Sequence, residues 1–163
     1  MSKIGIADTC FARVDMAKFA IATINSNSKN NGIIRYTVPG IKDLPVACKK
    51  LFLEDNCDIV LAFGMAGPMA IDKQCSHEAS LGIQQAQLQA SKHILEVFVH
   101  ADEAGTDKEL CEIAENRAEK HALNALALLK GKTALTEFAG MGKRQGKDDV
   151  GPLKVLILDC SSF

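Results

Sequence analysis

Histidine and carboxylate residues that lie close together could carry acid–base chemistry at two places in this sequence. His77 and Glu78 are adjacent in the segment CSHEASLG, and His100 precedes two carboxylates in VHADEA. A neutral histidine beside a carboxylate can take up or release a proton near neutral pH. The alternative for the first pair is structural: a helix starts here, with Ser76 as its N-cap and Glu78 complementing the helix dipole. Capping residues are common at helix starts, which favours the structural interpretation without excluding the other.

Two loops rich in glycine and proline suggest a second kind of site. The segment TVPGIKDLP (37–45) holds two prolines and one glycine, and GMAGPMAID (64–72) holds two glycines and one proline. Such loops are either tight turns or places where exposed backbone amides approach a ligand closely. The sequence has no G-x-G-x-x-G after its first strand and no GxxxxGK[ST], so a dinucleotide or P-loop nucleotide site is unsupported.

Four strand–helix units alternate along the chain and must position these residues. Short apolar or β-branched runs predict strands at 3–7, 33–38, 58–63 and 94–99. Helical spacing of apolar residues predicts helices at 17–24, at 44–51 with Asp43 as N-cap, from about 75 through 86, and at 106–130. This alternation predicts an α/β fold with a parallel sheet and helices on both faces. Ligands of such sheets bind beyond the carboxyl ends of the strands, which nominates the loops 8–13, 39–43, 64–72 and 100–105.

The last predicted helix is apolar around much of its girth, and the chain after it has an irregular, polar pattern. Such a helix either packs against another copy of the chain or is deeply buried in its own domain, and its periodicity does not distinguish these two possibilities. Arg117 and His121 lie one turn apart on it, and both can be part of a solvated face. We expect residues 1–139 to form one domain and residues 140–163 an irregular tail. The apolar end VLILDCSSF (155–163) could form a small strand or pack on the domain.

The bulk composition excludes several classes of partner. The 163 residues include 19 Lys and Arg against 20 Asp and Glu, so no charge excess predicts a nucleic acid or an anionic membrane as partner. The start of the chain lacks a signal-peptide pattern, and no apolar run is long enough to span a membrane, so we expect a soluble cytoplasmic protein. The six cysteines form no CxxC pair and no zinc-finger spacing, so we expect no metal site.

Five segments resemble the archaeal-type riboflavin synthases, which are similar to lumazine synthase. They are FARVDMA (11–17), TVPGIKDLPVACKKL (37–51), HEASLG (77–82), KHILEVFVHADEA (92–104) and the RQG…D.GP pattern (144–152). The resemblance implies a flavodoxin-like, three-layer α/β/α fold with a four-stranded parallel sheet in the order 2-1-3-4. It also implies a homopentamer with active sites between neighbouring subunits. The implied reaction transfers a four-carbon unit between two molecules of 6,7-dimethyl-8-ribityllumazine, giving riboflavin and 5-amino-6-ribitylamino-uracil.

The same resemblance assigns substrate-binding residues. Phe11, next to Ala12, matches the aromatic residue that stacks on the heterocycle. The turn fixed by proline and glycine would aim the amides of residues 41–43 at the hydroxyls of the ribityl chain. Arg117 matches a basic residue near the neighbouring site. The full set implied to bind substrate is Phe11, Ala12, Pro39, Gly40, Ile41, Lys42, Asp43, Gly64, Met65, Ala66 and Arg117, of which Gly64, Met65 and Ala66 match the pyrimidine-contacting loop.

One departure from lumazine synthase bears on the chemistry. The G-x-T-x-H motif that usually follows the third strand in that enzyme is absent, and no histidine occurs before His77. This favours riboflavin synthase over lumazine synthase and leaves the proton-transfer groups open, with His77, Glu78 and His100 as candidates. No redox cofactor is implied, because one substrate donates and the other accepts, although a divalent cation such as Mg²⁺ remains compatible. The alternatives are a lumazine synthase and a non-catalytic carrier of flavin or lumazine.

Overall fold

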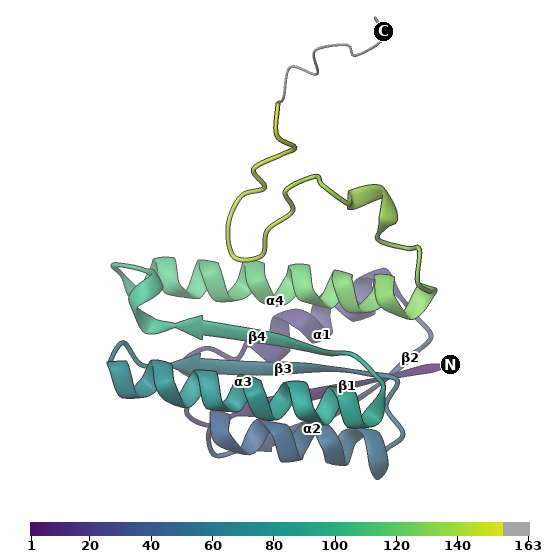
Figure 1. Ribbon diagram of the computed structural model, residues 1–163, viewed down its shortest axis with the longest axis horizontal. Coiled ribbons are helices and arrows are strands. Elements are labelled where there is room, and N and C mark those ends of the chain that lie inside the picture. Colours follow the sequence, from purple (N-terminus) through teal and green to yellow (C-terminus); the bar gives the residue numbers. More distant parts are fainter. Residues whose placement is uncertain (155–163) are drawn as a thin grey trace, which may run out of the picture.

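Four parallel strands form the centre of the computed structural model, which describes residues 1–154 (Figure 1). The strands are β1 (Ser2–Thr9), β2 (Asn31–Val38), β3 (Ile59–Ala66) and β4 (Ile94–His100). Their order in the sheet is β2-β1-β3-β4, and all three pairings are parallel. The predicted strand order and fold class are therefore confirmed. Every residue of β3 is buried, because this strand is central and both of its faces are covered.

Two helices cover each face of the sheet. Helices α1 (Met16–Asn27) and α4 (Asp107–Lys130) lie together on one face, whereas α2 (Leu44–Leu53) and α3 (Ala70–Ala90) cover the other (Figure 1). Three short 3₁₀ turns complete the secondary structure of residues 1–154: Ile41–Asp43, Ala101–Glu103 and Thr136–Phe138. Within residues 1–154, no helix combines the length and the apolar character that crossing a bilayer requires.

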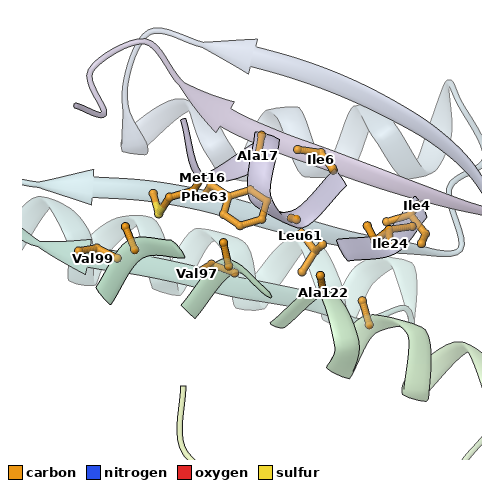
Figure 2. Packing of buried hydrophobic residues seen from close by; sticks show 14 of the residues in the cluster. Ile4, Ile6, Met16, Ala17, Ile24, Leu61, Phe63, Val97, Val99 and Ala122 are labelled. Atoms are coloured by element: carbon orange, nitrogen blue, oxygen red, sulfur yellow. The ribbon is translucent and has the colours of Figure 1, made fainter. Parts of the chain in front are cut away.

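The alternation of side chains along the strands divides the core between the two faces. Ile4 and Ile6 of β1 point toward α1 and α4, whereas Ala7 points toward α2 and α3. Figure 2 shows Phe63 of β3 beside Met16 at the start of α1. Small residues on α4, such as Ala122, let that helix approach the strands closely. This packing fixes the strand ends on which the predicted loops depend.

Two predicted helix starts differ from the structure. Helix α3 begins at Ala70, earlier than predicted, and its cap is the Asp72 carboxylate, which accepts from the amide of Met69 at 3.0 Å. Ser76 lies inside the helix and donates to the carbonyl of Asp72 at 3.0 Å, so it is no N-cap. The structural interpretation of His77 as part of a helix start is therefore wrong. The side chain of Asp43 does not cap α2; it accepts from the amide of Gly40 at 3.4 Å and closes the preceding 3₁₀ turn.

The chain beyond α4 folds back along the outer surface of that helix (Figure 1). The amide of Gly146 donates to Asn116 at 3.0 Å, and Lys120 donates to the carbonyls of Arg144 and Lys147, each at 2.8 Å. Residues 140–154 contain no helix or strand, as predicted for this part of the tail. The suggestion of a small strand at 155–163 lies outside the described residues. The domain boundary at residue 139 stays a prediction.

Candidate active site

The carboxyl ends of the four parallel strands bring the nominated loops to one edge of the sheet. Two cavities open at this edge, one of about 230 Å³ on the side of α1 and one of about 480 Å³ on the side of α3. The smaller one adjoins the ends of β1 and β2, and the larger one adjoins the end of β4. The candidate site therefore consists, within one chain, of two cavities on opposite faces of the sheet.

A network of charged groups lines the smaller cavity. Asp8 accepts from Arg35 Nη2 at 2.5 Å and Nε at 3.1 Å, and from Thr37 Oγ1 at 2.6 Å. The same guanidinium donates from Nη2 to Asp15, the N-cap of α1, at 2.9 Å. The hydrogen bonds to Asp8 raise the pKa of Arg35. Burial of the guanidinium lowers it, but the charge of Asp8 and the pairing with Asp15 raise it further, so the pKa is raised on balance. Arg35 thus joins two strands to the start of α1. This network was not predicted from the sequence.

The loop after β1 presents an aromatic side chain to the outside. Phe11 is 65% exposed, although large aromatic side chains are usually buried. The loop is tied to the end of β2, because Cys10 N donates to Val38 O at 2.9 Å and Phe11 N donates to Pro39 O at 3.3 Å. Ala12 lines the smaller cavity. The geometry suits a side chain that stacks on a flat ligand, as the resemblance implies for Phe11.

The loop after β2 keeps only part of its backbone free for a ligand. The amide of Asp43 donates to Gly40 O at 3.1 Å, so the prediction that all three amides of residues 41–43 face a ligand fails for Asp43. The amides of Ile41 and Lys42 have no acceptor among residues 1–154. Gly40 has an extended backbone, and a Cβ added to it would meet no atom within 4 Å. Open space therefore lies above this glycine.

Gly64, Met65 and Ala66 belong to β3 and not to a loop, and all three are buried. A Cβ on Gly64 would lie 2.7 Å from the ring of Phe98 on β4 and 2.9 Å from Ile41. The glycine therefore makes room for both side chains. Through this contact, the loop after β2 meets the floor of the larger cavity.

The larger cavity lies between α3 and β4 and contains two of the predicted acid–base residues. His77 of α3 and His100 of β4 both line it. The buried Nδ1 of His100 has no hydrogen-bond partner among residues 1–154. The cavity lining is Lys73, Ser76, His77, Ser80, Glu96, Phe98, His100, Asp102 and Glu103. Three of these residues, Glu96, Phe98 and Ser80, were not predicted from the sequence as part of a site.

Glu78 lies apart from this cavity. Its carboxylate pairs with Lys42 and accepts from Gln74 at 3.1 Å. These hydrogen bonds, that of Lys42 first, lower the pKa of Glu78 and keep it ionised at neutral pH. The structure thus brings His77 and His100 together and directs Glu78 toward the loop after β2.

Arg117 of α4 anchors the loop that follows β4. Its Nη1 donates to Phe98 O at 2.6 Å and to Glu103 at 2.8 Å, and its Nη2 donates to Glu103 at 2.6 Å. Burial alone would raise the pKa of Glu103, but hydrogen bonds from Arg117 and from the amide of His100 lower it on balance. Arg117 therefore holds the loop after β4 in place through its contacts with Phe98 and Glu103.

His121, one turn beyond Arg117, is not part of a solvated face. Burial, and next the charge of Arg117, lowers its pKa to about 4, so its imidazole is neutral at pH 7. Its Nδ1 is buried and has no partner in the described part of the chain. Residues 1–154 also contain no group of three or more His, Cys, Asp or Glu residues that could hold a metal ion.

Comparison with known proteins shows the family to which this chain belongs. The family model for 6,7-dimethyl-8-ribityllumazine synthase matches residues 1–133. The chain is 56% identical to the riboflavin synthase of Methanothermobacter marburgensis over 153 residues, which cover 94% of this chain and 100% of that protein. It is 46% identical to the riboflavin synthase of Archaeoglobus fulgidus, covering 93% and 98% of the two chains. The resemblance predicted from the sequence is confirmed, and the protein belongs to the 6,7-dimethyl-8-ribityllumazine synthase family, together with riboflavin synthases from archaea.

Proposed function

We propose that this protein is a riboflavin synthase, which converts two molecules of 6,7-dimethyl-8-ribityllumazine into riboflavin and 5-amino-6-ribitylamino-uracil. One observation carries the proposal: relatives named riboflavin synthase are 44% to 56% identical over at least 93% of the chain. The absence of the G-x-T-x-H motif favours the same activity over that of lumazine synthase.

Binding of the two substrates is assigned to the rim of the sheet. Phe11 stacks on one heterocycle, beside Ala12. The loop with Pro39, Gly40, Ile41, Lys42 and Asp43 holds a ribityl chain, and Gly64, Met65 and Ala66 lie next to the pyrimidine. The amides of Ile41 and Lys42, which have no acceptor within residues 1–154, and the open space above Gly40 support this assignment.

The chemistry needs two flat molecules held face to face. Fixing both converts a bimolecular encounter into a local one, which lowers the barrier by up to about 7–11 kcal/mol in well-aligned cases. The 7-methyl group of the lumazine is acidic because its anion is conjugated with the ring, so weak bases suffice. His77 and His100, which share the larger cavity, are assigned to proton transfer, with Glu78 as a further candidate. No cofactor is required in this scheme; loss of turnover on adding EDTA, restored by Mg²⁺, would contradict it.

The complete site is assigned to the boundary between two subunits of a homopentamer in the cytoplasm. Support comes from Ala12, the neighbour of Phe11, and from His100, which line two different cavities on opposite faces of the sheet within one chain. Mixing two weakly active variants, Phe11→Ala and His100→Ala, tests this. After exchange of subunits, some interfaces would combine the two intact halves and regain turnover. Sites contained within one chain would give no such gain.

A fluorescence assay tests the activity itself. Purified protein supplied with 6,7-dimethyl-8-ribityllumazine alone should produce riboflavin fluorescence over many turnovers. A lumazine synthase would instead require a four-carbon phosphate and the aminouracil. A carrier would bind the lumazine in stoichiometric amount without turnover, and either of these results would overturn the proposal.

A further inference from the structure

A carboxyl group on the floor of the larger cavity has no assigned role. Glu96, Phe98 and His100 alternate along β4 and point to the same face of the sheet, whereas Val97 and Val99 are buried against the other face. On the opposite wall, α3 presents the short side chains of Ser76 and Ser80. These small residues leave the cavity of about 480 Å³ above β4 and expose Glu96 to it.

Glu96 is held in place by an uncharged hydrogen-bond donor. Its Oε1 accepts from Ser80 Oγ at 2.8 Å. Lys73 pairs with Asp102 at 2.5 Å, and Arg117 pairs with Glu103 at 2.6 Å. Among residues 1–154, Glu96 has no lysine or arginine within ion-pair distance. The charged and titratable groups that face the cavity with it are Lys73, His77, His100, Asp102 and Glu103.

The surroundings of Glu96 suit a proton acceptor. Burial raises its pKa, and the hydrogen bond from Ser80 and the charge of His100 offset only part of this effect. A carboxylate in such a half-buried place is a better base than one in water. Phe98, directly beside it on β4, packs on Gly64, so Glu96 adjoins the strand assigned to the pyrimidine contact.

We infer that Glu96 is a further proton-transfer residue of the reaction, with Ser80 as the residue that positions it. This inference rests on the proposed function. In the step assigned to it, a C–H bond of the 7-methyl group of one lumazine breaks and an O–H bond forms on Glu96. The electron pair stays on the lumazine, delocalised over its ring, and the carboxylate becomes a neutral acid.

The variant Glu96→Gln tests the assignment, since glutamine keeps the shape and the acceptor oxygen for Ser80 but cannot take up the proton. Exchange of the 7-methyl protons for deuterium, followed by NMR, reports this step alone. We expect both this exchange and kcat to fall about 100-fold or more, with KM changed only about two- to threefold. The exposed carboxylate Glu54, replaced by glutamine, is the matched control and should leave both rates unchanged.

The variant Ser80→Ala tests the role of Glu96 through the pH dependence of kcat, which would stay unchanged if Ser80 and Glu96 were merely structural. Loss of the hydrogen bond removes an influence that lowers the pKa of Glu96, so the acidic limb of kcat against pH should shift to higher pH. This variant also decides the matter if Glu96→Gln does not fold. Exchange in Glu96→Gln within about threefold of the wild type, or an unmoved limb in Ser80→Ala, would overturn the inference. Because the wild type is assayed beside them, failure of the proposed function would be seen separately, as absence of riboflavin from the wild type.

Discussion

Replacing Arg35 with methionine should destabilise the fold by about 2–4 kcal/mol, since methionine keeps an apolar stem but donates no hydrogen bond. The magnitude follows from Asp8, whose side chain is 9% exposed and accepts two hydrogen bonds from the guanidinium. Removing one partner of a fully buried ion pair costs about 3–5 kcal/mol. The Arg35 side chain is 37% exposed, so water reaching Asp8 in the variant offsets part of that cost. Thr37 remains as the one donor to Asp8 within the described residues.

The assay is urea unfolding followed by circular dichroism, with wild type and variants at one chain concentration. The control is Asp15→Asn, which removes the charge on the other side of the same guanidinium. Asp15 is 50% exposed, so this variant should lose no more than about 1 kcal/mol. The double variant Asp8→Asn/Arg35→Met should lose less than the sum of its single variants, because no buried charge is then left unpaired. Equal losses in Arg35→Met and Asp15→Asn, or strict additivity in the double variant, would refute the reasoning.

Three further predictions concern the rim and the long helix. Gly40→Ala should change the unfolding free energy by no more than about 0.5 kcal/mol, because the space above Gly40 is open, yet raise KM in the fluorescence assay; an unchanged KM would contradict the assigned ribityl contact. Gly64→Ala should lose about 1–3 kcal/mol in urea unfolding, because its Cβ would overlap the ring of Phe98, and a smaller loss would mean that the ring shifts freely. His121 is neutral when folded because its pKa is lowered from 6.5 to about 4, so the unfolded chain binds the extra proton and stability falls as pH drops through this window. Between pH 7.5 and pH 5 this loss is about 2 kcal/mol, and urea unfolding of His121→Leu should lack it, whereas an equal loss in that variant would assign it to other groups.

The sheet could be predicted from the sequence because each strand carries its own local pattern. The apolar run DIVLAF predicts a strand with both faces covered, and β3 is that strand. Its end was not predictable in the same way: Gly64 suggests a turn, but the strand continues through it to Ala66, and the missing side chain leaves space for the ring of Phe98. The start of α3 could not be predicted either, because no capping residue marks it. Its cap comes from Asp72, inside the helix, and no capping residue precedes Ala70.

Features of the candidate site could be predicted from the sequence where a single loop forms them, but not where two elements form them together. Phe11 is conspicuous as an aromatic residue in a polar turn, and the structure exposes it. The Asp8–Thr37 hydrogen bond depends on the register of β1 against β2, which places these two residues opposite each other. Glu96 sits in the apolar run ILEVFV, and only the small serines of α3 reveal that it faces a cavity.

The segment beyond α4 has an effect on how the rim responds to ionic strength. Gly146 rests so closely on Arg117 that a Cβ there would lie 2.6 Å from the guanidinium Nε. Together with the helix, this backbone leaves Arg117 and Glu103 only 13% and 23% exposed. Dissolved ions screen exposed charges far more than sheltered ones. The Arg117–Glu103 ion pair, which holds the loop after His100, should therefore depend little on salt concentration. In a chain shortened before Gly146, the same ion pair would be more exposed and would weaken as salt is added.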